Sequence, residues 1–225
     1  MCMKKIFGLL SLLSCGHLLI AQQKIDSNYA NPYYLQRMEY FNQVPKQHNN
    51  IVFLGNSITE RGKWQDLLPG MKVINRGIGG DNTFGVLGRL DGILAEKPAR
   101  IYLLIGINDL GRGLPIAVII HNYQRIIARI KQLSPKTKVY IQSVLPLNEA
   151  VLPYAYLKGK NVKVQELNVA IQQVVQEHHL TYINLHEVFA DEQGELKKEL
   201  TEDGIHLKPM AYVEWVKYLK AKKFI

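Results

Sequence analysis

Short apolar runs alternate with longer segments in which apolar residues recur every three or four positions, from about residue 51 to residue 219. The short runs are rich in β-branched and aromatic residues, which is typical of buried strands. We predict strands at residues 51–54, 73–74, 101–105, 139–141 and 182–185.

The longer segments have the period of amphipathic helices. The clearest begins behind Pro115, a favoured first residue of a helix, and another begins behind Thr83, which we predict to be its N-cap. Further helices are expected around 164–175 and from Pro209 onward. Strands that alternate with helices in this way predict an α/β fold, a three-layer sandwich with a five-stranded parallel sheet and helices on both faces.

The first residues form a separate segment. Lys4 and Lys5 precede an apolar stretch, 6–20, that is too short to cross a bilayer comfortably. This pattern is typical of a secretory signal, so we predict a signal peptide at 1–21, no membrane span, and an exported protein that is periplasmic or extracellular. An alternative is a lipoprotein signal in which Cys15 carries the lipid anchor.

The rest of the chain is expected to form one domain at 51–225, preceded by an N-terminal helical extension at 22–50. Both cysteines, Cys2 and Cys15, lie in the predicted signal. Removing the signal would leave no thiol, which excludes disulfides, cysteine nucleophiles and cysteine metal ligands.

The formal net charge is +9, and Lys4 and Lys5 contribute two of these charges. Basic and acidic residues are otherwise interspersed, and the densest basic cluster, 217–223, is expected on the solvated face of the last helix. We therefore expect no nucleic-acid partner, while attraction to anionic surfaces or substrates stays open.

Four polar segments are placed to meet at one edge of the predicted sheet. Three of them follow predicted strands and the fourth precedes the last helix: 55–57 (Gly-Asn-Ser), 77–81, 106–109 and 203–206. In an open α/β sheet, the loops at the carboxyl ends of the strands converge on the crevice where ligands bind. The segments supply a serine, glycine turns, an asparagine amide, an aspartate and a histidine, which are the groups that acyl transfer by an activated serine requires.

Ser57 alone would be explained as the N-cap of a short helix. Asp203 and His206, three residues apart in a turn, supply the base that a serine hydroxyl needs. The Gly80 N–H, the Asn108 side chain and the Ser57 N–H are candidate donors to the oxyanion of a tetrahedral intermediate. Each segment alone has a simpler structural explanation, so the inference rests on all of them occurring in this order.

These blocks resemble those of the SGNH hydrolases, also called the GDSL esterase and lipase superfamily, over about residues 51–219. The resemblance implies an SGNH, flavodoxin-like fold. It also implies that Ser57 is the nucleophile, that His206 is the general base and that Asp203 orients the histidine.

The same resemblance implies an oxyanion hole formed by Gly80, Asn108 and the Ser57 N–H. Asn56 departs from the family, which usually has aspartate before the serine. We expect this change to alter how rigidly Ser57 is held without abolishing activity. Family members of this shape include sugar O-acetylesterases, lysophospholipases and proteins like platelet-activating-factor acetylhydrolase.

Other motifs fail on inspection. The residue two after Ser57 is Thr59 where the nucleophile elbow of the α/β-hydrolases has glycine. The glycine-rich segment 77–81 is not followed by the third glycine of a dinucleotide fingerprint. His178-His179 lacks a spaced carboxylate and His186-Glu187 is predicted to be a turn, so we expect no metal and no cofactor.

These observations favour a secreted carboxylic-ester hydrolase whose substrate is a small-molecule or glycan ester, chiefly a short-acyl (acetyl) ester of a carbohydrate. The alternatives are a lysophospholipase or acylhydrolase of lipid esters, and a non-catalytic glycan-binding domain on the same fold.

The candidate substrate-lining residues are Asn56, Asp81, Tyr154 and Tyr156. The tyrosines belong to a loop at 146–161 that is expected to form a wall or lid of the crevice, unless they serve packing alone. The oligomeric state is left open.

Overall fold

A single all-parallel sheet forms the centre of the computed structural model, which describes residues 25–225. Its strands are β1 (Ile51–Gly55), β2 (Val73–Gly77), β3 (Arg100–Leu104), β4 (Lys138–Gln142) and β5 (Thr181–Ile183). They lie in the order β2-β1-β3-β4-β5, and every neighbouring pair is parallel. The predicted α/β fold with a five-stranded parallel sheet is therefore confirmed. The predicted signal at 1–21, including Cys15, lies outside the described residues.

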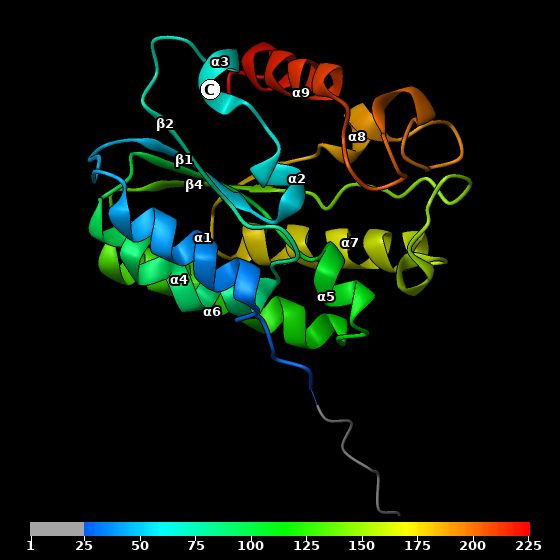
Figure 1. Ribbon diagram of the computed structural model, residues 1–225, viewed down its shortest axis with the longest axis horizontal. Helices are drawn as coiled ribbons and strands as arrows, with labels where there is room; N and C mark the ends of the chain where they lie inside the picture. Colours follow the sequence, from blue (N-terminus) through cyan, green and yellow to red (C-terminus); the bar gives the residue numbers. More distant parts are fainter. Residues whose placement is uncertain (1–24) are drawn as a thin grey trace, which may run out of the picture.

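Helices cover both faces of the sheet (Figure 1). One face carries α1 (Pro32–Gln43), α4 (Thr83–Ala95), α6 (Ile116–Leu133) and α7 (Asn161–Glu177); the other carries α3 (Trp64–Leu67), α8 (His186–Phe189) and α9 (Pro209–Ala221). The short helices α2 (Ser57–Glu60) and α5 (Ile107–Gly111) follow β1 and β3, and the 3-10 turns η1 (Ala155–Leu157) and η2 (Lys198–Leu200) lie in later loops. Within residues 25–225, none of the helices has the length and apolar character needed to span a bilayer.

Strand β2 is longer than the sequence predicts, because polar residues continue it beyond 73–74. It lies at the edge of the sheet. The Asn75 amide donates to the Glu60 carbonyl at 2.9 Å, and the buried Arg76 pairs with Glu96 at 3.3 Å. The polar side chains of this edge strand are thus satisfied by neighbouring elements, which is why the apolar pattern alone stops short.

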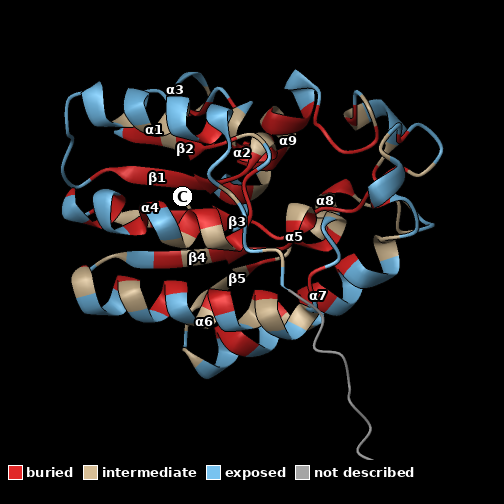
Figure 2. Cartoon of the chain, turned by 60° about the horizontal axis from the view of Figure 1, so that its bottom comes forward, coloured by how far each residue is buried: buried red, intermediate tan, exposed pale blue. Residues whose placement is uncertain are grey.

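Aromatic side chains pack between the sheet and the face formed by α3 and α9. Phe53, Tyr102 and Tyr140 are register partners on adjacent strands, and their rings stack with centroids 4.9 and 4.7 Å apart. Trp64 of α3 stacks on Phe53 at 3.9 Å and meets Trp215 of α9 edge-on at 5.0 Å. β1 is buried along its whole length, and β2 and β3 are buried at every position but one each (Figure 2), so the edge that carries the candidate site is backed by a packed core.

Several predicted helix starts are wrong. Asn82, not Thr83, is the N-cap of α4, and its side chain accepts the Gly85 N–H at 3.0 Å. Helix α6 begins one residue after Pro115, which occupies the cap position itself. His186-Glu187 opens α8 instead of forming a turn. Asparagine and threonine are both good caps, so the sequence alone could not choose between neighbouring positions.

Candidate active site

Ser57 is the first residue of α2 and lies just beyond the carboxyl end of β1. Asn56 caps this helix, because its side-chain oxygen accepts the Ile58 N–H at 3.0 Å. A Cβ atom on Gly55 would lie 2.3 Å from the Leu104 carbonyl oxygen, so a side chain there would force β1 and β3 apart. The local sequence thus ends the strand tightly and presents Ser57, partly exposed, at the edge of the sheet.

His206 and Asp203 approach Ser57 from the far end of the sequence. The Ser57 hydroxyl donates to His206 Nε2 at 3.0 Å, and His206 Nδ1 donates to Asp203 Oδ2 at 2.7 Å. The turn that carries them needs Gly204, which has a left-handed φ of +84° and whose Cβ would lie 2.6 Å from the Asn148 carbonyl oxygen. The structure therefore brings together the three side chains that the sequence analysis singled out.

The Asp203 carboxylate also accepts backbone hydrogen bonds. Its Oδ1 accepts the N–H of His206 at 2.8 Å and that of Ile205 at 3.2 Å. Burial raises the pKa of Asp203, but the hydrogen bonds from the side chain and backbone of His206 outweigh this and hold the pKa below its usual value. An ionised aspartate keeps the proton of the imidazole on Nδ1, which leaves Nε2 free to accept from Ser57.

Gly80 lies in the turn between β2 and α4, beside the end of β1, where the Ile78 N–H donates to the Gly55 carbonyl at 3.1 Å. Its φ is +74°, and nothing lies within 4 Å of the position that a Cβ would take. Glycine is thus required here for its backbone conformation. Within residues 25–225, the N–H groups of Gly80 and Ser57 donate no hydrogen bond, so both are free to donate to a ligand.

Asn108 lies in the first turn of α5, and its Nδ2 donates to the Asp81 carbonyl at 2.7 Å. This bond ties α5 to the turn that contains Gly80. It uses one of the two amide hydrogens, so the second remains available to a ligand. Two of the expected oxyanion donors, Asn108 and the Gly80 N–H, are therefore linked through the backbone of Asp81.

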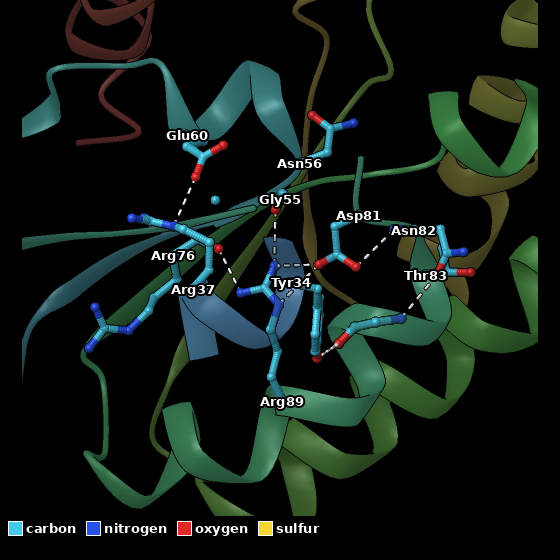
Figure 3. Close-up of polar contacts among 12 residues, drawn as sticks. Tyr34, Arg37, Gly55, Asn56, Glu60, Arg76, Asp81, Asn82, Thr83 and Arg89 are labelled. Atoms are coloured by element: carbon cyan, nitrogen blue, oxygen red, sulfur yellow. Dashed lines mark hydrogen bonds and ion pairs between the residues drawn. The ribbon is translucent and has the colours of Figure 1, made fainter. Parts of the chain in front are cut away.

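Two residues that the sequence analysis placed along the substrate are buried: Asn56 is 0% exposed and Asp81 is 2% exposed. Asp81 Oδ2 accepts Nε and Nη2 of Arg89 at 3.0 and 2.7 Å, and the same guanidinium donates to the Gly55 carbonyl at 2.9 Å (Figure 3). Burial raises the pKa of Asp81, and the charge of Arg89 opposes that rise. Asn56 caps α2 and Asp81 holds the Gly80 turn against the end of β1, so neither side chain lines the crevice.

Glu60, one turn after Ser57, was missed by the sequence analysis. Its Oε2 accepts the Gly79 N–H at 2.8 Å, while its Oε1 accepts the Tyr33 hydroxyl at 2.8 Å and lies 2.9 Å from Arg37 Nε. The carboxylate therefore joins the helix of Ser57, the turn of Gly80 and helix α1. A charged residue one helical turn beyond the serine was the signal that could have revealed this role.

Asp109 was also missed, although it directly follows Asn108. It is 0% exposed, and its Oδ1 accepts the Thr83 hydroxyl at 2.5 Å and the Thr83 N–H at 3.1 Å. Asn122 of α6 donates to the same hydroxyl at 2.9 Å. Burial raises the pKa of Asp109 to about 6, although the hydrogen bonds from Thr83 lower it. This carboxyl fixes α5 against the start of α4, and thus fixes Asn108.

The two tyrosines of the 146–161 loop differ in their contacts. The Tyr154 hydroxyl donates to Asp203 Oδ2 at 3.1 Å, and its ring meets the His206 ring edge-on with centroids 6.4 Å apart. Tyr156 is 56% exposed and its ring centroid lies 5.9 Å from that of Tyr154. Leu157, by contrast, is fully buried. The loop forms a wall beside His206, with Tyr154 against the acidic residue of the site.

A serine, an imidazole and a carboxylate in hydrogen-bonded series, at the carboxyl edge of a parallel sheet, are the arrangement of a serine-dependent hydrolase of carboxylic esters. Among residues 25–225, no cluster of three or more histidine, cysteine or acidic side chains is arranged to hold a metal ion.

Comparison with known proteins gives the family. Residues 53–213 match the GDSL-like lipase/acylhydrolase family, and the chain belongs to it. Platelet-activating factor acetylhydrolase IB subunit alpha1 of Homo sapiens is 25% identical over 168 residues, which cover 72% of this chain and 70% of that protein. The protein is accordingly an acylhydrolase of the carboxylic ester hydrolase class.

Solved structures match the fold. A GDSL-like lipase from Bacteroides thetaiotaomicron superposes with a TM-score of 0.71 at 23% identity, covering 85% of this chain and 98% of that one. A catalytic mutant of an acetylxylan esterase from Geobacillus stearothermophilus superposes with a TM-score of 0.61 at 16% identity, covering 78% of this chain and 94% of that one.

Proposed function

We propose that this acylhydrolase removes short acyl groups, chiefly acetyl, from carbohydrate esters, with Ser57 as nucleophile, His206 as general base and Asp203 as the residue that orients the base. The observation that carries the assignment of roles is the continuous series from Ser57 Oγ to His206 Nε2 at 3.0 Å and from His206 Nδ1 to Asp203 Oδ2 at 2.7 Å.

Acylation begins when Ser57 Oγ attacks the ester carbonyl carbon and His206 Nε2 accepts the hydroxyl proton. The carbonyl oxygen becomes an oxyanion, to which the N–H groups of Ser57 and Gly80 and the free amide hydrogen of Asn108 donate. The bond to the alcohol then breaks, and the departing oxygen takes the proton from Nε2. The product of this half-reaction is an acyl-serine.

Deacylation repeats these steps with water. His206 Nε2 accepts a proton from the water that attacks the acyl carbon, and the same donors stabilise the second oxyanion. When the bond to Ser57 breaks, the serine oxygen recovers the proton from Nε2 and the carboxylic acid departs. Apart from the ester and water, both half-reactions use only groups of this chain.

Preference for acetyl groups is supported by the names of two relatives, one an acetylhydrolase and the other an acetylxylan esterase. A carbohydrate alcohol is supported by the exposed ring of Tyr156, a surface on which a sugar ring can stack. Export, which the basic and apolar N-terminal segment favours, would give the enzyme access to such glycans.

A substrate panel tests this proposal. We expect p-nitrophenyl acetate and acetylated xylo-oligosaccharide to be hydrolysed with higher kcat/KM than p-nitrophenyl octanoate or lysophosphatidylcholine. Ser57→Ala should abolish hydrolysis, and Ser27→Ala, a substitution at an exposed serine, serves as the matched control. Equal activity of the wild type and Ser57→Ala would overturn the assignment of the nucleophile.

A lipid-ester acylhydrolase is the second candidate, favoured by a mainly apolar groove of about 520 Å³ beside α3 and α9. The groove is lined by Leu67, Leu207, Met210 and neighbouring residues, and includes Glu202, which precedes Asp203. If the octanoyl ester is the best substrate, and Met210→Glu lowers only that activity, this alternative replaces the acetyl proposal. The family assignment counts against the non-catalytic glycan-binding alternative.

A further inference from the structure

The hydroxyl of Tyr154 and the imidazole of His206 share one oxygen of Asp203. Oδ2 accepts His206 Nδ1 at 2.7 Å and the Tyr154 hydroxyl at 3.1 Å, while Oδ1 accepts two backbone N–H groups. A carboxylate can only accept, so the tyrosine must be the donor. Asp203 thus has a side-chain donor that does not belong to the reacting series.

We propose that Tyr154 is a positioning residue of the active site: its hydroxyl fixes the Asp203 carboxylate and draws negative charge away from the imidazole, which keeps His206 neutral, and able to accept a proton, at lower pH. This inference rests on the proposed roles of Ser57, His206 and Asp203, and adds a residue that acts through the aspartate.

The physical basis is that two donors, the Tyr154 hydroxyl and His206 Nδ1, share the negative charge of Asp203 Oδ2. A carboxylate that already accepts a hydrogen bond stabilises an adjacent imidazolium less than a carboxylate without one. Removing the tyrosine hydroxyl should therefore make protonation of the imidazole more favourable. Burial, followed by the charge and hydrogen bond of Asp203, raises the pKa of Tyr154, so its hydroxyl keeps its proton throughout the working pH range.

The loop that carries Tyr154 is anchored to the turn of Asp203 by its backbone as well. The Asn148 N–H donates to the Gly204 carbonyl at 2.8 Å, and the Asn148 amide donates to the Leu196 carbonyl at 2.7 Å. The buried Leu157 fixes the other side of the loop. Tyr154 therefore approaches the carboxylate from a supported segment, which favours a fixed wall over a moving lid.

The other ionisable groups near Tyr154 and Asp203 are the same residues in the wild type and in a variant that lacks one tyrosine hydroxyl. Arg61 and Glu202 pair with each other at 3.2 Å beside the Asp203 turn. On α9, the Tyr212 hydroxyl donates to the Ile58 carbonyl at 2.7 Å, and burial raises the pKa of Tyr212 far above the assay range. A change in pH profile after removal of one tyrosine hydroxyl can thus be assigned to that hydroxyl.

Tyr156 provides the matched control. It belongs to the same loop, its ring lies 5.9 Å from that of Tyr154, and its hydroxyl makes no hydrogen bond within residues 25–225. Replacing either tyrosine by phenylalanine removes one hydroxyl and keeps the ring. Only Tyr154→Phe removes a donor from Asp203.

The experiment measures kcat/KM for p-nitrophenyl acetate from pH 4 to 9 for the wild type, Tyr154→Phe and Tyr156→Phe, with thermal unfolding of each. We expect the midpoint of the acid limb to rise by roughly 0.5 pH unit in Tyr154→Phe and to stay in place in Tyr156→Phe. The plateau of Tyr154→Phe should fall no more than about tenfold, because Ser57, His206 and the oxyanion donors remain.

An acid limb that stays in place or moves to lower pH in Tyr154→Phe would overturn the inference, and so would equal shifts in both variants. A loss of activity that follows the loss of thermal stability, without a change in the midpoint, would assign Tyr154 to packing alone. These outcomes leave the proposed function standing, because Ser57→Ala and the substrate panel test it separately.

Discussion

The Asn108 amide has two hydrogens, and within residues 25–225 one of them is used in a hydrogen bond. That hydrogen is donated to the Asp81 carbonyl at 2.7 Å, which fixes the plane of the amide. A donor held in this way can stabilise an oxyanion without reorganising when the charge develops. The accepting oxygen belongs to Asp81, the residue that follows Gly80, so this hydrogen bond holds the donor on α5 against the turn between β2 and α4.

Asn108→Ala is expected to lower kcat by about 10²–10³ with a smaller change in KM, because the lost donor matters most in the transition state. Steady-state kinetics with p-nitrophenyl acetate measure this effect. Asn42→Ala, at an exposed position of α1, controls for substitution as such. A kcat for Asn108→Ala close to that of the wild type would remove this residue from the oxyanion hole.

At the residue scale, the sequence was sufficient to predict the reacting groups but not the buried residues that hold them in place. Ser57, His206 and Asp203 were recognisable because serine chemistry needs these three residue types, and they occur after the first strand and in a turn before the last helix. Asn56 and Asp81 lie in the same motifs but point into the protein. The partner that draws Asp81 inward is Arg89, a contact that depends on how α4 packs, and no local pattern specifies it.

At the scale of elements, helix α1 is part of the framework of the site, although it precedes the segment, 53–213, that matches the family. Tyr33 and Arg37 on α1 both contact Glu60 on α2. Glu60 in turn holds the Gly79 N–H, next to the proposed donor of Gly80. Two elements that are distant in sequence thus set the position of one backbone turn.

Glu60→Ala should lower kcat roughly tenfold, since it frees the turn that presents the Gly80 N–H, and a donor displaced by a fraction of an ångström loses much of its effect. KM should change little. Tyr33→Phe should give a smaller loss in the same direction, because Arg37 still holds the carboxylate. Glu39→Ala, an exposed acidic position on α1, is the matched control, and an equal loss in that variant would contradict the role of Glu60.

The element boundaries show what periodicity leaves undetermined. The pattern located α6 and α9 well because their apolar stripes are long. It predicted Thr83 as the N-cap of α4. In the structure the Thr83 hydroxyl donates to Asp109 instead, and Asn82 is the N-cap. The position of the N-cap therefore depends on the hydrogen bond between Thr83 and the Asp109 carboxylate of α5, which is a tertiary contact. The same reasoning explains β2, whose polar second half is satisfied by its neighbours.

At the scale of the whole molecule, strand–helix alternation was enough to predict the layers and the parallel sheet, because a crossover that returns to the same sheet must cover one of its faces. The aromatic stack from Trp64 through Phe53 to Tyr140 was not foreseen. Its members are far apart in sequence and meet only through the register of β1, β3 and β4.

Asp109 makes the stability of the molecule depend on pH. Burial raises its pKa to about 6, well above the value of about 3.9 expected for an unfolded aspartate. Between these values the unfolded chain releases a proton that the folded chain keeps, so the contribution of this group to stability falls as pH rises from about 4 to 6 and is constant above. The full effect is at most about 3 kcal/mol.

Asp109→Asn removes this dependence, so the free energy of unfolding of the variant relative to the wild type should increase as pH rises from 4 to 7. Urea unfolding at several pH values measures the difference. Asp91→Asn, at an exposed position on the same side of the molecule, should give a far smaller slope. A difference between Asp109→Asn and the wild type that is independent of pH would show that the carboxyl is ionised in the fold throughout.

The central claim is that His206 activates Ser57, and covalent labelling tests it most directly. A fluorophosphonate should modify the wild type once, on the peptide that contains Ser57, as measured by mass spectrometry of the intact and digested protein. The rate should fall by about 10³ or more in His206→Ala and stay unchanged in His121→Ala, at an exposed histidine. Labelling of another residue, or equal rates in His206→Ala and the wild type, would contradict the account.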